Sequence, residues 1–196
     1  MKRLLLGGFL AALSPFALAA LQQGDTAPDI DARASLAGRA FNYSLHDALK
    51  KGAVVVYFYP AAYTGGCNVQ AHEFSVQHDR FAAAGASIIG VSLDNIDKLN
   101  EFSADPNYCA GKVAVASDID GKISKAYALN IREAVAGKKD TRGFEINHGF
   151  AERTTFVVTP DEKIAATLSG LAPAANVAKA LEVVQQLSDA KKAESW

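Results

Sequence analysis

The residues best suited to chemistry stand in the segment 60–70, which reads PAAYTGGCNVQ. Pro60 fixes the backbone and ends the apolar run before it, and Thr64 supplies a hydroxyl that both donates and accepts hydrogen bonds. Cys67 falls where a helix is expected to begin. The unpaired N–H groups and the positive dipole end of a helix N-terminus favour the thiolate, which is the nucleophilic form of cysteine. The segment therefore predicts Cys67 as a nucleophile.

The residue types around Cys67 suggest what would support it. Gly65 and Gly66 let the backbone approach a small substrate and present its N–H groups. Gln70 follows one helical turn later, within reach of the sulfur, although a solvated place on the helix surface is an open alternative. We assign the fixed positive charge to Arg153, because an arginine at the start of a buried strand is costly unless it has a task. A surface ion pair is the alternative role for Arg153.

Length and composition indicate one globular domain, since the chain has 196 residues and an ordinary balance of hydrophobic and charged types. The net charge of −1 gives no indication of nucleic acid or an anionic membrane as a partner. The N-terminus differs: Lys2 and Arg3 precede an apolar run at 4–13, and small residues follow at positions 17 and 19. This pattern is typical of a cleaved secretory signal peptide, because the run is too short to span a bilayer; an uncleaved anchor is the alternative. We expect a signal peptide at 1–19 and a single periplasmic or secreted domain at 20–196, with no membrane contact after cleavage.

The hydrophobic pattern predicts an α/β fold in which strands and helices alternate. The first half of the chain is expected to form short strands or a hairpin within 23–49, a buried strand at 53–59, a helix at 67–84, a strand at 86–93 and a helix capped by Asp94. The second half is expected to form a short strand at 113–115, a short helix near 123–127, a loop at 132–150, a hairpin at 154–158 and 163–168, and a final amphipathic helix at 177–187. Strand–helix alternation favours a parallel core, and the late hairpin adds antiparallel strands. The predicted architecture is a thioredoxin-like mixed sheet flanked by helices.

The chain has only two cysteines, Cys67 and Cys109. In an oxidising compartment the two could pair as a structural disulfide, so this alternative stays open beside the catalytic one. No metal-ligand spacing connects the four histidines at positions 46, 72, 78 and 148. His148 stands close before Arg153, and we therefore keep it as a candidate neighbour of the site.

Several of these residues fall into a pattern that resembles one family, the peroxiredoxins. The segment 24–28, Gly-Asp-Thr-Ala-Pro, is similar to the opening of that family. Pro60, Thr64 and Cys67 match its active-site signature, and Arg153 matches its arginine-bearing strand. The segment 67–71 is most similar to the bacterioferritin-comigratory, or Q-type, branch. The resemblance runs from about residue 24 to residue 187.

This resemblance implies a peroxidase that works without a metal or an organic cofactor. Its substrates would be hydrogen peroxide and small organic hydroperoxides. The Cys67 thiolate would attack one peroxide oxygen and become a sulfenic acid. Arg153, Thr64 and the backbone N–H of Cys67 would hold the two oxygens and stabilise the developing charge, while Gln70 would belong to the polar network that orients Arg153.

One departure from the family pattern concerns the second cysteine. Many Q-type members carry it five residues after the first, where this chain has His72. Some members place it after the next strand, in a context similar to that of Cys109, so the resemblance implies Cys109 as the resolving residue. The reductant would be a thioredoxin-like or glutaredoxin-like protein, and we expect a monomer or homodimer. A thiol–disulfide oxidoreductase of the same fold is a rival, but it needs a cysteine where Gln70 stands; a non-catalytic protein with a structural disulfide is the other.

Overall fold

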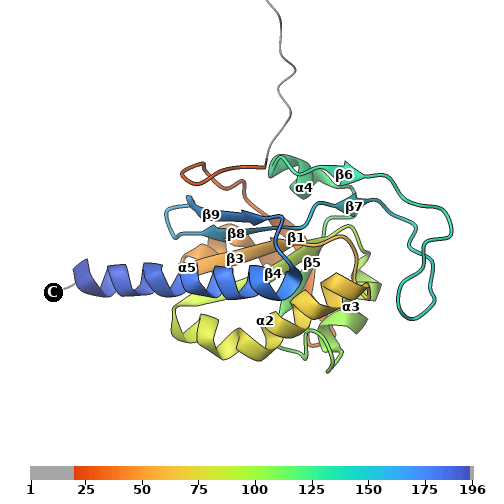
Figure 1. The fold of residues 1–196 in the computed structure, drawn as a ribbon, viewed down its shortest axis with the longest axis horizontal. Coiled ribbons are helices and arrows are strands. Elements are labelled where there is room, and N and C mark those ends of the chain that lie inside the picture. Colours follow the sequence, from red (N-terminus) through yellow and green to blue (C-terminus); the bar gives the residue numbers. More distant parts are fainter. Residues whose placement is uncertain (1–19, 195–196) are drawn as a thin grey trace, which may run out of the picture.

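The computed structural model describes residues 20–194 and shows one mixed sheet flanked by helices (Figure 1). The signal peptide expected at 1–19 lies outside the described residues. The sheet has seven strands in the order β2-β1-β5-β4-β3-β8-β9, and a second, two-stranded sheet pairs β6 with β7. The strands are β1 Asp31–Leu36, β2 Arg39–Ser44, β3 Ala53–Phe58, β4 Ala86–Ser92, β5 Ala114–Ser117, β6 Ile131–Arg132, β7 Phe150–Ala151, β8 Thr154–Val158 and β9 Ile164–Ser169. The helices are α1 Leu45–Leu49, α2 Gly65–Ala83, α3 Ile96–Ala104, α4 Lys122–Ala126 and α5 Pro173–Glu194.

Strand β3 lies inside the sheet and connects its two halves. It runs parallel to β4, and β4 runs parallel to β5. On its other side β3 pairs with the antiparallel strand β8, which continues into β9 through the predicted hairpin. The structure thus confirms the mixed sheet expected from the sequence. In such α/β sheets, ligands bind beyond the carboxyl ends of the parallel strands, which is where β3 leads into the segment 60–67.

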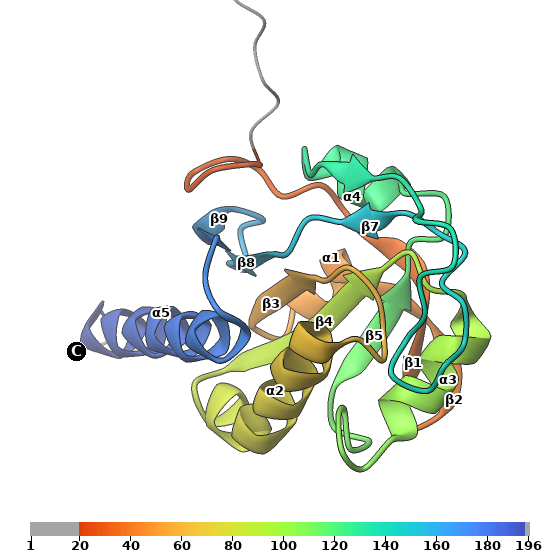
Figure 2. The ribbon, with the colours of Figure 1, turned by 45° about the vertical axis from the view of Figure 1, so that its right-hand side comes forward.

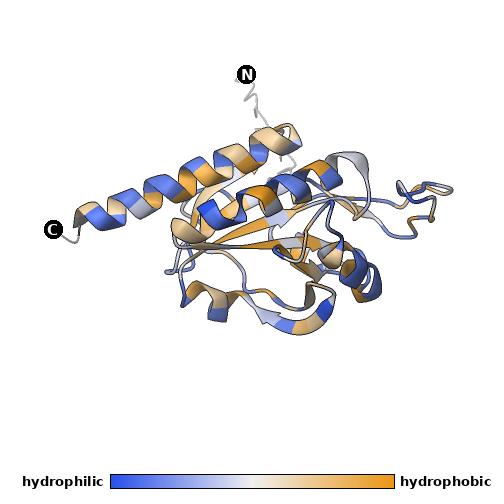
Figure 3. Ribbon diagram, turned by 90° about the horizontal axis from the view of Figure 1, so that it is seen from below, coloured by the Kyte–Doolittle hydropathy of each residue, from blue (hydrophilic) through white to orange (hydrophobic). Residues whose placement is uncertain are grey.

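The alternating side chains of β3 divide the core into two layers. Val55 and Tyr57 face one cluster, which includes residues of α2, α3 and α5. Val54, Val56 and Phe58 face the other, beneath α1 and the turn after α4. A continuous apolar run is what a strand covered on both faces requires. Figure 2 shows α2 and α5 together beside the sheet, with α4 on the opposite side, and Figure 3 shows hydrophilic residues along both α2 and α5.

Helix α2 begins two residues earlier than the sequence predicted. Its N-cap is Thr64, and its first backbone hydrogen bond runs from Asn68 N–H to the Thr64 carbonyl at 2.8 Å. Both glycines at 65 and 66 therefore lie in the first turn, where the N–H groups need no partner within the helix. At the other end, Gly85 adopts a φ of 77°, which suits the residue after a helix C-terminus.

One predicted helix cap was wrong. Helix α3 is capped by Asn95, whose side chain accepts a hydrogen bond from Lys98 N–H at 2.9 Å. Asp94 is fully buried instead, and its carboxylate accepts from the Ala62 N–H at 2.7 Å and from the Ser92 hydroxyl at 2.8 Å. A buried carboxylate must find donors, and those offered by Ala62 and Ser92 hold Asp94 away from the helix end. Within residues 20–194, no helix is long and apolar enough to cross a membrane.

Candidate active site

Cys67 lies in the first turn of α2 with 1% of its surface exposed. It is a free thiol packed in the core cluster that contains Tyr57 and Phe74. The first helical hydrogen bond of α2 is donated by Asn68, so the N–H groups of residues 65–67 precede the bonded ladder. The sulfur therefore lies in a nearly dry site at the positive end of a helix dipole.

The positive charge assigned from the sequence lies beside this sulfur. Nη2 of Arg153 is 3.2 Å from the Sγ of Cys67. The register of the sheet explains why Arg153 lies next to Cys67, because Thr154 pairs with Phe58 across β8 and β3. The arginine that precedes β8 thus lies at the carboxyl end of β3, where the chain turns toward Cys67. A guanidinium at this distance places a fixed positive charge and a hydrogen-bond donor directly against the sulfur.

A buried amide network orients Arg153. Its Nη1 donates to Oε1 of Gln70, whose side chain is fully buried. The amide nitrogen of Gln70 donates to Oδ1 of Asn176 at 3.1 Å, and the Thr155 hydroxyl donates to the same oxygen at 2.6 Å. Asn176 then donates to the Leu168 carbonyl at 3.1 Å. Helices α2 and α5 and strands β8 and β9 therefore converge on one guanidinium.

The sequence reading missed Thr155 and Asn176. A signal for Asn176 was available, since an amide at this position shares a helix face with the apolar residues Ala180 and Val184. A polar side chain on an apolar stripe needs a buried partner. Thr155 gave no comparable signal, because threonine is ordinary in a strand.

Gly66 makes room for the guanidinium. A Cβ added at position 66 would lie 3.2 Å from Nη2 of Arg153 and 3.2 Å from Cγ of Pro173. At Gly65, by contrast, a Cβ would have nothing within 4 Å. Of the two glycines, Gly66 is therefore the one on which the approach of Arg153 to Cys67 depends.

The segment 60–64, which we call the active-site turn, connects β3 to α2 and is tightly held. The Thr64 hydroxyl donates to the Ala61 carbonyl at 2.8 Å. Tyr63 adopts a positive φ of 59°, an uncommon conformation for a tyrosine. Its carbonyl accepts from both the N–H and the hydroxyl of Thr141, at 2.8 and 3.0 Å. Pro60 borders a surface depression that Arg153 also lines.

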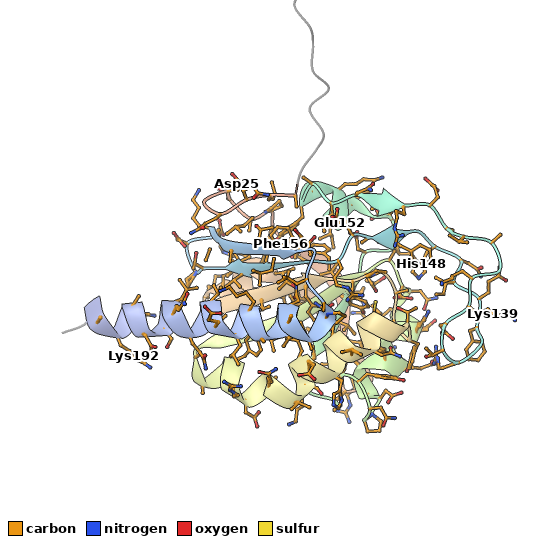
Figure 4. All side chains as sticks on the ribbon, viewed as in Figure 1. Asp25, Lys139, His148, Glu152, Phe156 and Lys192 are labelled. Carbon is orange, nitrogen blue, oxygen red and sulfur yellow. The ribbon has the colours of Figure 1, made fainter. Side chains whose placement is uncertain are left out.

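His148 reaches this turn indirectly. Its Nε2 is 2.9 Å from Oδ1 of Asp94, the carboxylate that also accepts the Ala62 N–H. The sequence analysis kept His148 as a candidate neighbour, and the structure places one carboxylate between it and the active-site turn. Figure 4 shows His148 near the sheet, whereas Lys139 lies farther out in the same loop between β6 and β7.

Cys109 is also free and has no exposed surface. Burial, with a smaller contribution from Asp105, raises the pKa of the Cys109 thiol well above its ordinary value. Cys67 and Cys109 belong to the same core cluster, and both thiols add to the raised pKa of Tyr57, which burial mainly causes. His72 bonds through Nδ1 to the Asn107 carbonyl at 3.0 Å and so connects α2 to the Cys109 segment.

No group of three or more His, Cys, Asp or Glu side chains within residues 20–194 could hold a metal ion. The other histidines lie apart: His46 bonds to Glu162 and His78 to its neighbour Asp79. The described residues thus converge on the sulfur of Cys67 and on the guanidinium beside it.

Comparison with known proteins places this arrangement in a family. A sequence model of the AhpC/TSA family matches residues 23–167. A putative peroxiredoxin bcp from Helicobacter pylori is 31% identical over 138 residues, which cover 70% of this chain and 81% of that protein. The structure of peroxidoxin BcpB from Mycobacterium tuberculosis matches with a TM-score of 0.70 at 26% identity, covering 85% of this chain and 97% of that one.

A third similarity concerns the fold. The bacterioferritin comigratory protein of Xanthomonas campestris, studied for its alkyl peroxide reduction activity, matches with a TM-score of 0.64 at 22% identity. The match covers 87% of this chain and 99% of that protein. These neighbours confirm the thioredoxin-like fold predicted from the sequence.

The contact geometry at Gly66 generates a test. Gly66→Ala places a methyl group against the guanidinium of Arg153, so we expect oxidation of Cys67 by peroxide to slow by about tenfold or more, since small misplacements at a reacting centre are costly. The matched control is Gly65→Ala, where the added methyl meets open space. Stopped-flow or rapid-quench measurement of thiol loss gives the rate constant. Equal rates in the two variants would contradict the role assigned to Gly66.

Proposed function

The chain belongs to the AhpC/TSA family and is a peroxiredoxin of the Bcp, or Q, type, hence a thiol-dependent peroxidase, and we propose that Cys67 is its peroxide-reducing residue. The observation that carries this proposal is the 3.2 Å contact between Sγ of Cys67 and the guanidinium of Arg153. A half-buried arginine held by a buried glutamine stabilises negative charge at a fixed point. That point is the sulfur and the space next to it.

In the proposed reaction the Cys67 thiolate attacks one oxygen of the peroxide. An S–O bond forms, the O–O bond breaks, and the sulfur is oxidised to a sulfenic acid. The second oxygen leaves with the electron pair, takes up a proton, and departs as water or an alcohol. Arg153 stabilises the charge that passes from sulfur to oxygen, and its five fixed donors can contact both atoms.

Thr64 and the helix N-terminus would orient the peroxide. The Thr64 hydroxyl already gives its proton to the Ala61 carbonyl, so its remaining lone pairs can accept a hydrogen bond from the peroxide O–H. The unbonded N–H of Cys67 donates to the attacked oxygen. Pro60 and Arg153 line the depression that borders the site, and this is the side from which we expect the peroxide to enter.

We assign the second step to Cys109. Its thiol would attack the sulfenic sulfur of Cys67, forming the S–S bond and releasing water, and a thioredoxin-like or glutaredoxin-like protein would then supply two electrons to reduce the disulfide. Burial keeps Cys109 protonated in the structure described here. Its segment must therefore open before it reacts, and opening exposes the thiol and removes the burial that raises its pKa.

Substrate class and location complete the proposal. We assign hydrogen peroxide and small organic hydroperoxides as substrates; the alkyl peroxide reduction studied in the Xanthomonas neighbour supports the latter. The basic and apolar pattern of residues 1–19 supports export to the periplasm or beyond. The two rival readings are weaker, because Gln70 stands where an oxidoreductase needs its second cysteine and both cysteines are free.

Replacing the nucleophile tests the first step. Cys67→Ser removes the thiolate, so we expect peroxide consumption to fall to the rate of the buffer alone. Loss of hydrogen peroxide is measured in a single turnover with the reduced protein in excess. Cys109→Ser is the matched control, because it removes a thiol but keeps the proposed nucleophile and should still consume one peroxide per chain. Peroxide consumption by Cys67→Ser at the rate of the control would refute the assignment.

Replacing the second thiol tests resolution. Cys109→Ser should leave the first oxidation of Cys67 at the wild-type rate, and the sulfenic acid should persist long enough for a dimedone adduct to appear by mass spectrometry. Coupled turnover with thioredoxin and its reductase should be lost. Normal cycling of this variant would instead show that a small thiol or another chain resolves Cys67.

A further inference from the structure

The excursion between β6 and β7, residues 133–149, braces the active-site turn from outside. Figure 2 shows it running from the small sheet past α3. Ile146 of the excursion packs with Ala61 and Phe150 in a small core of their own. Thr141 bonds to the Tyr63 carbonyl, and the guanidinium of Arg142 lies 3.4 Å from the centre of the Tyr63 ring.

An ionic contact between the excursion and the buried interior joins His148 to Asp94. Its Oδ2 accepts the Ala62 N–H at 2.7 Å and the Ser92 hydroxyl at 2.8 Å. Its Oδ1 faces Nε2 of His148 at 2.9 Å and Nζ of Lys98 at 3.1 Å. The carboxylate itself has no exposed side-chain surface, so His148 and Lys98 are its counter-charges.

The surroundings of His148 fix its protonation. Nδ1 lies 2.7 Å from the Gly149 carbonyl, which can only accept. Nε2 lies 2.9 Å from the Asp94 carboxylate, which also accepts. A neutral imidazole has a single N–H, whereas an imidazolium has two. Both contacts are satisfied together only when His148 is doubly protonated.

The charges around His148 agree with this geometry. The charged groups facing it are Asp94 and Lys98, and Lys98 is also 3.6 Å from Asp140 of the excursion. Burial would lower the pKa of His148, but the Asp94 hydrogen bond and charge outweigh it, and the pKa rises above 6.5. Burial would raise the pKa of Asp94, but His148, Lys98 and the Ala62 N–H outweigh it and the pKa falls.

The directions of these two pKa shifts define the pH range in which the ion pair between His148 and Asp94 is stabilising. The contribution of His148 to the stability of the folded protein is fully present below about pH 6.5, its ordinary pKa. This contribution is lost as the pH rises through the raised pKa of His148. The contribution of Asp94 is present above 3.8, its ordinary pKa, and is lost as the pH falls through its lowered pKa. Above the window, a neutral His148 keeps one of its two hydrogen bonds.

We propose that His148 is a positioning residue for peroxide reduction, which acts by holding Asp94, and through Asp94 the Ala62 N–H, so that the active-site turn presents Thr64 and Cys67 to the peroxide. This inference rests on the proposed role of Cys67. The turn is short, and Ala62 lies two residues before Thr64. Loosening its anchored N–H therefore displaces the groups that contact the peroxide, and displacements of this size slow a reaction strongly.

The test compares His148→Gln across pH with an otherwise identical chain that retains His148. Glutamine keeps one donor for Asp94 but carries no charge. The matched control is His78→Gln, which removes a histidine that contacts Asp79 on the outer part of α2. All three chains carry Cys109→Ser, so that only Cys67 is oxidised. The second-order rate constant for its oxidation by hydrogen peroxide is measured from pH 5.5 to 9.5 by rapid quench and alkylation.

We expect His148→Gln to react roughly tenfold more slowly at pH 6, the size that losing one charge-assisted hydrogen bond gives. The ratio of the two rate constants should approach one as the pH rises through the titration of His148, because both chains then lack the charge. Taking a ratio at each pH cancels the ionisation of the attacking thiol. A ratio of one at pH 6, or a ratio that is constant with pH, overturns the proposal.

A second measurement covers the case in which His148→Gln does not fold. In the wild-type protein, ¹⁵N NMR of the imidazole rings should show His148 with both nitrogens protonated at pH 6.5, and a neutral ring there overturns the proposal. Neither outcome touches the assignment of Cys67, which the serine variant tests separately. Loss of peroxidase activity in Cys67→Ser together with a pH-independent ratio would retain the proposed function and reject only the role of His148.

Discussion

The contact between the Arg153 guanidinium and the Cys67 sulfur is the interaction on which the rest of the site depends. The two residues are 86 positions apart in the chain, and the pairing of β8 with β3 brings them together. A guanidinium in a partly dry site is costly unless each of its donors finds an acceptor. Gln70 supplies one acceptor and the sulfur another, so that the positive charge is stabilised by the group that we propose it activates.

This requirement explains why polar residues interrupt the apolar faces around the site. Gln70 lies on the buried side of α2, and Asn176 on the buried side of α5. The two amides bond to each other, and Asn176 also bonds to the Thr155 hydroxyl and to the Leu168 carbonyl. A polar network inside a core is stabilising only when its members are all bonded, and here the bonds fix where the guanidinium points.

Much of this arrangement could be predicted from the sequence. The parts that could not be predicted share one cause. The strand at 53–58, the helix after Thr64 and the hairpin at 154–169 follow from local periodicity and turn residues. The resemblance to the peroxiredoxins pointed to Cys67, Thr64 and Arg153. The partners Asn176 and Asp94 did not follow, because their roles depend on contacts across 106 and 32 residues. Asp94 was misread as a helix cap, since a cap and a buried acceptor look alike until the tertiary structure provides the donor.

The central claim is that the planar guanidinium at position 153 activates the sulfur, and one rate constant tests it most directly. Arg153→Lys keeps the positive charge but loses the fork that contacts Gln70 and Cys67 together. The matched control is Arg80→Lys, on the exposed side of α2. We predict that the second-order rate constant for oxidation of Cys67 by hydrogen peroxide falls about 100-fold or more in Arg153→Lys and stays near the wild-type value in Arg80→Lys. A rate constant in Arg153→Lys within threefold of wild type would contradict the account.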